Sequence, residues 1–310
     1  MSYLGDTLRV RKQGAREAGG GGRGPATITP MSRFIHQTLF VLILFSGIVS
    51  GCAPIPLTAT LTPTLVLASP APSTPTLEPP DTGWQVIQPG LERRMIRMYN
   101  EQDQHIESLY IFRLDQNRYR LDIGYHETPQ SLERWQAETN ALLVVNGGFF
   151  RVENEKYFPN GLTILNGETL GSSYEPFAGM LAIGEGGAEL RWLAQKPYEA
   201  GEPLRAGLQS FPMLVKPGGE LGFPEEFEDN LPARRTVIGQ DTQGRILFIV
   251  TPRGHFTLHG LSLYLTGSDL DLDIAINLDG GPSSGILVAN PPEVIPSQTL
   301  LPIVILVYPR

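Results

Sequence analysis

The sequence predicts an α+β fold for residues 81–310, as a single domain with a large, mostly antiparallel twisted sheet and a few helices. Short apolar runs of strand length are separated by Gly, Pro, Asn and Asp, which favour turns. Only two segments have a helical pattern. Strands therefore do not alternate with helices, as they would in a parallel sheet.

Three strands are predicted at the start of this domain, at residues 94–99, 106–114 and 119–125. The third alternates cleanly, with Leu121 and Ile123 on its apolar face and polar residues or glycine on the other. Such alternation is typical of a strand that packs one face against a core.

A helix is predicted to follow, with Thr128 as its N-cap, Pro129 in its first turn and its end near Thr139. Leu132 and Trp135 fall on the same side of this helix. We expect both side chains to point toward the core.

The rest of the domain is predicted to be strand-rich. Asn166-Gly167 between two apolar runs is a strong hairpin signal, and residues 258–265 form the second helix candidate. Two similar strand-to-turn stretches, 146–150 and 277–284, are open to interpretation as a diverged two-fold repeat. The further strands are expected at 141–145, 163–165, 168–170, 180–183, 189–193, 236–238, 245–250, 272–276, 286–288 and 302–308.

The charge of the chain argues against nucleic acid as a partner. The chain has 24 Lys and Arg and 32 Asp and Glu residues. Six of the basic and two of the acidic residues precede Cys52, so the residues after it carry a net charge of −12. Nucleic acids and anionic membrane surfaces are recognised through clustered positive charge. A small anionic substrate is compatible with this charge if a few arginines gather in one cleft.

Residues 31–52 have the layout of a lipoprotein signal peptide. A charged start is followed by a short apolar stretch and by small residues before Cys52. This ending resembles a bacterial lipobox, in which the cysteine is lipidated. Residues 1–30 are interpreted as a non-native or upstream extension, with the natural start expected at Met31. A plain signal peptide or signal anchor with a chance cysteine is the alternative.

Residues 53–80 are rich in Pro, Thr and Ala and predict an extended tether. Cys52 is the only cysteine, so the domain after it has no internal disulfide. We therefore expect an extracytoplasmic protein of the cell envelope, anchored to a membrane by a lipid on Cys52. The sequence does not indicate its oligomeric state.

The stretch at 277–285 is the strongest candidate for a site. It lies between two apolar runs and combines a carboxylate, Asp279, with two serines and three glycines. Glycine lets the backbone approach a ligand closely. An ordinary hairpin turn is the alternative interpretation, because Asp-Gly between two strands is a common hairpin signal.

A serine-hydrolase interpretation of this stretch is rejected, although residues 281–285 match G-x-S-x-G. That motif needs a strand before it and a helix after it, whereas a strand is expected at 286–288. The catalytic histidine of that fold also follows the serine. The last histidine of this chain, His259, precedes it.

No metal and no cofactor is predicted. His255 and His259 have a zinc-like spacing, but no glutamate stands beside the first, and glycines bracket the pair. Asp269, Asp271 and Asp273 alternate with leucines, which is typical of a solvated strand edge. The sequence has no glycine-rich phosphate loop of the GxxxxGK or GxGxxG kind.

Arg234 and Arg235 stand at the start of a predicted strand. A surface pair close to the acidic residues 225–229 is one interpretation. An arginine fork that binds a phosphate or a carboxylate is the other.

Five motifs stand out along the domain: NGGFF at 146–150, PNGL at 159–162, QSFPMLV at 209–215, RTVIG at 235–239 and NLDGGPSS at 277–284. They occur in the order seen in the phosphodiester glycosidase family, which this chain resembles from about residue 91 to residue 308. The chain departs from the family pattern at Phe211, where glycine is usual, and at Pro282, where a small residue is commoner.

The resemblance implies hydrolysis of the bond between the anomeric carbon of a sugar and a phosphodiester oxygen. A carbohydrate or sugar phosphate is then the expected substrate. The leaving group is a phosphate monoester, whose second pKa is about 6, so little protonation is needed. One carboxylate and one cation on the phosphate then suffice, whereas most glycosidases need two carboxyl groups.

On this basis Asp279 is predicted to be the nucleophile or the base that activates water, and Arg235 is predicted to hold the phosphate. Side chains of the other motif residues are expected to bind sugar hydroxyls or phosphate oxygens, and backbone N–H groups at the glycine pairs are expected to form anion nests. The predicted binding residues are Asn146, Gly147, Gly148, Asn160, Gly161, Gln209, Asn277, Gly280, Gly281, Ser283 and Ser284.

A non-catalytic envelope lipoprotein that binds glycans or sugar phosphates is the alternative function. The presence of Asp279, Arg235 and both glycine motifs favours the enzyme, because a binding module has no need for all of them.

Overall fold

The computed structural model describes residues 79–310 apart from residue 175. The predicted extension, signal peptide and lipidation site Cys52 lie outside the described residues, as does nearly all of the tether. The described chain is mostly β, with two α-helices and two short 3-10 turns. No helix in this part of the chain is long and apolar enough to cross a membrane.

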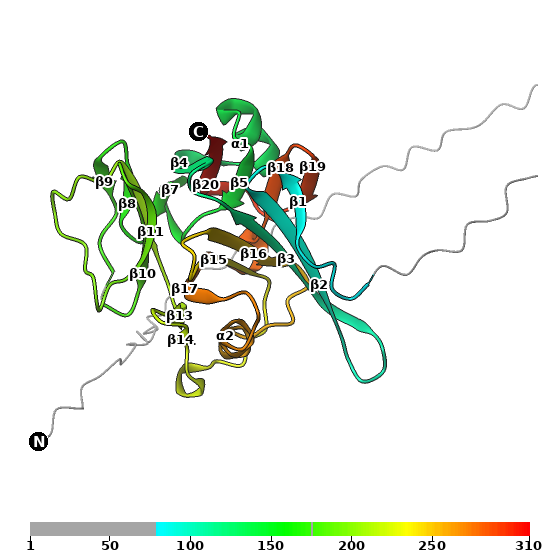
Figure 1. The fold of residues 1–310 in the computed structure, drawn as a ribbon. Coiled ribbons are helices and arrows are strands. Elements are labelled where there is room, and N and C mark those ends of the chain that lie inside the picture. The colour runs from blue at the N-terminus through cyan, green and yellow to red at the C-terminus, as the bar shows by residue number, and fades with distance from the viewer. Residues whose placement is uncertain (1–78, 175) are drawn as a thin grey trace, which may run out of the picture. The chain divides into compact units, whose positions relative to one another are not determined.

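Sheet A has eight strands in the order β1-β2-β3-β16-β15-β17-β13-β14, and every neighbouring pair in it is antiparallel (Figure 1). Its strands are β1 (Gln85–Gln88), β2 (Leu91–Tyr99), β3 (His105–Leu114), β13 (Met213–Lys216), β14 (Glu220–Leu221), β15 (Arg235–Asp241), β16 (Ile246–Thr251) and β17 (Leu272–Asn277).

Sheet B has five antiparallel strands in the order β19-β18-β5-β20-β4. These are β4 (Tyr119–Gln130), β5 (Leu143–Asn146), β18 (Ile286–Ala289), β19 (Pro292–Ile295) and β20 (Leu301–Pro309).

Sheet C has five antiparallel strands in the order β11-β10-β12-β8-β9, and a separate hairpin joins β6 to β7. These strands are β6 (Phe150–Glu153), β7 (Lys156–Pro159), β8 (Thr163–Leu165), β9 (Glu168–Leu170), β10 (Gly179–Gly184), β11 (Gly187–Trp192) and β12 (Ala206–Ser210).

The prediction of a large, mostly antiparallel sheet is confirmed by sheet A, but many strands lie outside that sheet. The strands divide among three larger sheets and the separate β6–β7 hairpin, and the fold is more strongly β than α+β implies. The division arises because several connections carry the chain from one sheet to another instead of turning back within a sheet. The two-fold repeat stays a prediction.

The main core lies where the three sheets face one another. Phe112 and Phe248 of sheet A, Val145 and Ile305 of sheet B, and Leu208 of sheet C all belong to it. All five side chains are buried. Burial of such side chains is the main favourable contribution to folding.

The other face of sheet A is covered by α2 (Leu258–Thr266). Leu261 and Leu265 of this helix pack with Ile111 and Ile249 of the sheet. Both faces of sheet A are therefore buried around these strands. This explains why β16 is an unbroken apolar run rather than an alternating one.

Helix α1 (Leu132–Thr139) covers sheet B, beside β5 and β18. Leu132 and Trp135 are buried, as predicted, and the Trp135 indole Nε1 donates to Leu301 O at 2.9 Å. The predicted N-cap is wrong: Ser131 caps the helix, and its Oγ accepts from Arg134 N at 3.3 Å. Thr128 and Pro129 belong instead to β4, an edge strand, where a proline costs no ladder hydrogen bond.

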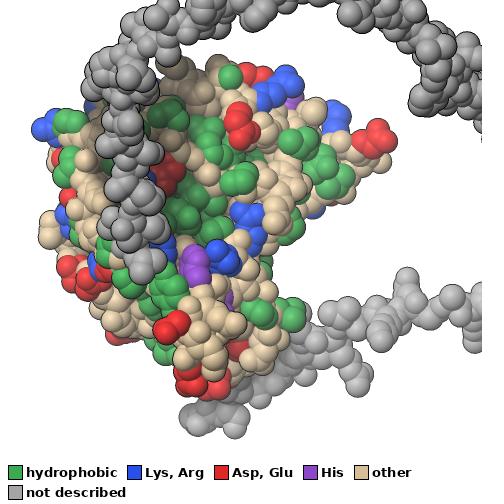
Figure 2. Space-filling model, turned by 90° about the vertical axis from the view of Figure 1, so that its right-hand side faces the viewer, with side chains coloured by type: hydrophobic (Ala, Val, Ile, Leu, Met, Phe, Trp, Pro, Cys, Tyr) green, Lys and Arg blue, Asp and Glu red, His purple; other side chains and the backbone are tan. Residues whose placement is uncertain are grey.

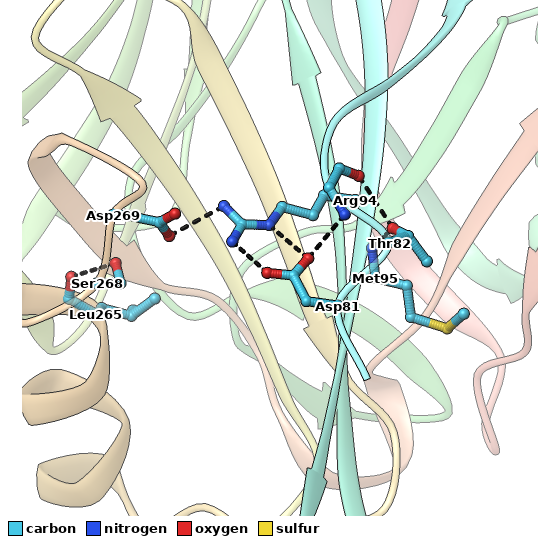
Figure 3. A network of polar contacts seen from close by, with 8 residues as sticks. Asp81, Thr82, Arg94, Met95, Leu265, Ser268 and Asp269 are labelled. Atoms are coloured by element: carbon cyan, nitrogen blue, oxygen red, sulfur yellow. Dashed lines mark hydrogen bonds and ion pairs between the residues drawn. The ribbon is translucent and has the colours of Figure 1, made fainter. Parts of the chain in front are cut away.

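An ion-pair network ties the start of the described chain to sheet A. The Arg94 guanidinium lies between the carboxylates of Asp81 and Asp269, which accept at 2.5 and 2.9 Å (Figure 3). The hydrogen bond from Arg94 holds the pKa of Asp81 below its usual value. Asp269 is thereby part of the ion-pair network of the fold.

Ser131→Ala should lower the free energy of unfolding by about 1 kcal/mol, because the backbone N–H of Arg134 loses its acceptor. For a domain of this size the loss corresponds to a fall of about 2–4 °C in Tm. Thr128→Ala is the matched control, since Thr128 is an exposed strand residue. Thermal unfolding of both variants would decide between the two caps, and an equal effect of both would contradict the cap seen here.

Candidate active site

The candidate site lies where two connections between sheets meet. Residues 278–285 lead from β17 of sheet A to β18 of sheet B, and Phe211-Pro212 leads from β12 of sheet C to β13 of sheet A. The two meet at their starts, where Asn277 N, at the end of β17, donates to Pro212 O at 2.9 Å. The alternative of a hairpin turn at 277–285 is therefore wrong, since its flanking strands belong to different sheets.

The Asn146 side chain joins three segments of the chain. Its Oδ1 accepts from Thr236 Oγ1 at 2.7 Å and from Gly285 N at 3.0 Å, and its Nδ2 donates to Asp279 O at 2.7 Å. Asn146 is only 1 % exposed. Its amide is thus committed to protein atoms. Asn146 positions the Asp279 segment, which differs from the predicted contact with the substrate.

The Asp279 carboxylate is the group best placed for chemistry. Burial raises its pKa to about 6, although hydrogen bonds from the Ser283 side chain and from Gly280 N–H oppose this by stabilising the charged form. The residue is partly exposed, so a ligand can reach it. Asp279 N donates to Gly147 O at 3.1 Å, which fixes the backbone. A carboxyl group with a pKa near neutrality can serve as a base or a nucleophile.

Tyr174 lies within the electrostatic range of Asp279 and was not predicted as a site residue. Its hydroxyl oxygen is buried and has no hydrogen-bond partner among the described residues. Burial, together with the charge of Asp279, raises the pKa of Tyr174 to about 12. A buried hydroxyl normally has a partner. The phenol is therefore available to a bound ligand.

Gln209 orients Tyr174 from sheet C. Its Oε1 accepts from Tyr174 N at 2.8 Å, and its Nε2 donates to Ser173 Oγ at 3.0 Å. A Cβ on Gly161 would collide with the Tyr174 ring, and a Cβ on Gly148 would lie 3.2 Å from Gln209 O. The two glycines are needed for packing. Gln209 is 1 % exposed and positions Tyr174, which differs from the predicted contact with the substrate.

Arg235 lies at the start of β15, beside Gly280. A Cβ on Gly280 would lie 3.8 Å from Arg235 Nη1. Arg235 Nε donates to Phe256 O at 3.2 Å and Nη2 donates to Leu231 O at 2.8 Å. Burial lowers the pKa of this guanidinium. The surface-pair interpretation is wrong for Arg235, which is 9 % exposed.

The predicted anion nests are wrong for two of the glycines. Gly147 N donates to Ile303 O at 3.0 Å, and Gly281 N donates to Arg234 O at 2.8 Å. These N–H groups are therefore not free to bind an anion.

The other predicted binding residues have different environments. Asn277 Nδ2 donates to Phe211 O at 2.9 Å, and Ser284 is fully buried. Asn277 Oδ1 and Ser284 Oγ have no hydrogen-bond partner within the described part of the chain. Asn160 is exposed, and its N–H donates to Phe149 O at 2.9 Å. Direct binding by Asn160, Ser283 and Ser284 stays a prediction.

The rejected motifs find structural explanations. A strand, β18, follows the G-x-S-x-G match, as argued against a nucleophile elbow. His259 Nδ1 contacts Phe223 O at 2.9 Å. Within residues 79–310, without 175, no group of three His, Cys, Asp or Glu side chains could hold a metal. On the face shown in Figure 2, basic and acidic side chains are interspersed with hydrophobic ones.

Two positioning or binding residues, Tyr174 and Thr236, escaped the sequence analysis. Thr236 was placed in a strand and in the RTVIG motif, but its bond to Asn146 joins two sheets that the sequence did not separate. Tyr174 lies in a loop without any motif, so no signal in the sequence singles it out.

Comparison with known proteins identifies the family of the chain. A model of the phosphodiester glycosidase family matches residues 139–307, more than half of the chain. The structure is similar to the zebrafish N-acetylglucosamine-1-phosphodiester alpha-N-acetylglucosaminidase catalytic domain auto-inhibited by its pro-peptide, with a TM-score of 0.57 and 18% identity over 72% of this chain and 85% of that one.

A hypothetical protein from Synechocystis is also similar, with a TM-score of 0.48 and 13% identity over 72% of this chain and 62% of that one. No curated protein sequence matches the chain at a significant level. The matched residues include all five motifs that carried the resemblance. The chain belongs to the phosphodiester glycosidase family.

Proposed function

We propose that this enzyme hydrolyses the C1–O bond of sugar-1-phosphodiesters, with Asp279 as the nucleophile or as the base that activates water. The observation that carries the proposal is a partly exposed carboxylate, with a pKa raised by burial, held where the family's motifs meet. One water is consumed, the bond between the anomeric carbon and the phosphodiester oxygen breaks, and free sugar and a phosphate monoester leave.

Arg235 is proposed to bind the phosphate. Its Nη1 lies beside Gly280 and has no hydrogen-bond partner among the described residues, while its other two nitrogens are anchored to carbonyls. A guanidinium held in this way stabilises the charge that develops on the leaving phosphate. Because a phosphate monoester has a second pKa of about 6, no strong general acid is required.

Tyr174 is proposed to donate a hydrogen bond to an oxygen of the bound substrate. Its hydroxyl is buried, unpartnered among the described residues and close enough to Asp279 for the charge of Asp279 to raise its pKa. A preorganised donor of this kind stabilises an oxygen that gains charge in the transition state.

Export and lipid anchoring through Cys52 are also part of the proposal. They are supported by the signal-like sequence of residues 31–52. The substrates would then be sugar-1-phosphodiesters of envelope polymers or exopolysaccharides.

Asp279→Asn should lower kcat/KM by about 10²–10⁴-fold, because the amide can neither attack carbon nor accept a proton. The assay is the release of free sugar from an α-N-acetylglucosamine-1-phosphodiester and from a UDP-sugar. A variant that keeps most of its activity would show that Asp279 does not have this role. Ligand-induced thermal stabilisation of the wild type without any sugar release would favour the non-catalytic binding protein.

The fold control for this variant follows from the pKa. Asp279 has a pKa of about 6 when folded, against 3.8 as a free side chain, so its ionisation disfavours the folded state increasingly between about pH 4 and pH 6. Above pH 6 the full cost is present in the wild type and absent in Asp279→Asn. We therefore expect the Tm of the variant at pH 7 to be no lower than that of the wild type.

The pH dependence of kcat/KM should show an acidic limb near pH 6. Below it the rate should fall about tenfold per pH unit as Asp279 becomes protonated. Ser283→Ala removes a hydrogen bond that stabilises the carboxylate, so it should move the limb to higher pH. A limb that does not move in Ser283→Ala would assign the titration to another group.

Tyr174→Phe should lower kcat by about ten- to a hundredfold through the loss of one donor, with a smaller effect on KM. The ring is kept, so its packing against Phe211, with centroids 5.0 Å apart, is preserved. Steady-state kinetics and Tm, measured together, would test this. An unchanged kcat would exclude Tyr174 from the reaction.

A further inference from the structure

An apolar pocket of about 630 Å³ lies beside the candidate site. Its lining includes the aromatic side chains Phe177, Trp192, Phe211, Phe223 and Phe227, together with Met213 and Leu258. Phe177 and Phe227 are 54 % and 66 % exposed, which is unusual for phenylalanine in a region without a partner. The volume of the pocket is typical of one that binds a small molecule.

One wall of this pocket is shared with the Asp279 side of the site. The Phe211 ring lines the pocket and packs edge-to-face against Tyr174, with centroids 5.0 Å apart. The Phe211 carbonyl accepts from Asn277, two residues before Asp279. Phe211 is therefore shared by the lining of the pocket and by the group of residues around the Asp279 carboxylate.

Another lining residue, Asp229, belongs to the loop that holds the proposed phosphate-binding arginine. Asp229 lines the pocket, and its charge acts on the Arg235 guanidinium. Arg235 Nη2 also donates to Leu231 O, in the same loop. A phosphate held by Arg235 would therefore lie near the loop that contributes Asp229 to the pocket lining.

The chemistry of the lining indicates what the pocket takes. Its charged residues are Lys216, Glu226 and Asp229, and Lys216 Nζ lies 5.1 Å from the centroid of the Trp192 ring. The remaining lining residues are hydrophobic or glycine, with no Ser, Thr, Asn, Gln or Tyr side chain. A sugar or a nucleobase needs convergent hydrogen-bonding groups, whereas a hydrocarbon chain needs none. The lining therefore favours a hydrocarbon.

We propose that this pocket is an aglycone subsite, and that the enzyme acts on sugar-1-phosphodiesters whose second ester carries a hydrocarbon chain. The inference rests on the proposed function, because it places the sugar at Asp279 and the phosphate at Arg235. An aglycone subsite also accounts for Phe211, a position at which the resembled family usually has glycine. A ring at this position adds apolar surface on the leaving-group side of the site.

The first test compares the hexyl and methyl diesters of α-N-acetylglucosamine-1-phosphate with the full chain. Each fully buried methylene contributes about 0.8 kcal/mol, about fourfold in affinity, so two buried methylenes already give about tenfold. The KM for the hexyl diester should be at least about tenfold lower. Equal KM values would overturn the proposal.

The second test uses variants. Phe227→Ser removes an exposed ring from the pocket and should raise the KM for the hexyl diester about fivefold, so that the preference over the methyl diester shrinks. Tyr99→Ser is the matched control, because Tyr99 is an exposed aromatic residue of β2 that does not line the pocket. An unchanged preference in Phe227→Ser, or an equal loss in Tyr99→Ser, would contradict the assignment.

A binding measurement separates this inference from the proposed reaction. Hexyl phosphate and methyl phosphate are titrated into the wild type and into Phe227→Ser by calorimetry. If neither diester is hydrolysed, the reaction fails, but tighter binding of hexyl phosphate that is lost in Phe227→Ser still supports the pocket. Equal binding of both phosphates overturns the pocket. Self-association weakened by Phe227→Ser would instead assign this surface to a second copy of the chain.

Discussion

The hydrogen bonds of the buried Asn146 amide are the constraint on which the site depends. They join the end of β5 in sheet B to Thr236 in sheet A and to both ends of the segment that carries Asp279. An asparagine suits this place because its amide accepts and donates at once. A buried amide without hydrogen-bond partners would lower the stability of the fold. The three segments must therefore come together for the Asn146 amide to be satisfied.

The electrostatics of Asp279 follow from the same geometry. The junction of the sheets removes water from the carboxylate, which raises its pKa, while Ser283 and Gly280 N–H limit the rise. The balance leaves a group that titrates close to neutral pH. A fully exposed carboxylate would be ionised but poorly positioned, and a fully buried one without these donors would stay protonated.

Most strands, the second helix and the Asn166-Gly167 hairpin could be predicted from the sequence, because alternation and turn residues act locally. The division into three larger sheets could not be predicted, because it depends on where each connection leads. A strand followed by glycine has the same sequence pattern in a hairpin as in a connection between two sheets. The helix cap shows the same limit. Thr128-Pro129 satisfied the local rule, but pairing of β4 with β20 extended the strand past it.

The motifs of the site could be predicted from the sequence, but the role of each motif residue could not. Asn146 and Gln209 were expected to touch the substrate, yet burial and local hydrogen bonds make them supports for Asp279 and Tyr174. Phe211 links this support to specificity. Its carbonyl accepts from Asn277 at the end of β17, while its ring packs against Tyr174 and lines the apolar pocket. The hydrogen bond between Asn277 and Phe211 therefore holds together the fold at this point and also fixes one wall of the proposed aglycone pocket.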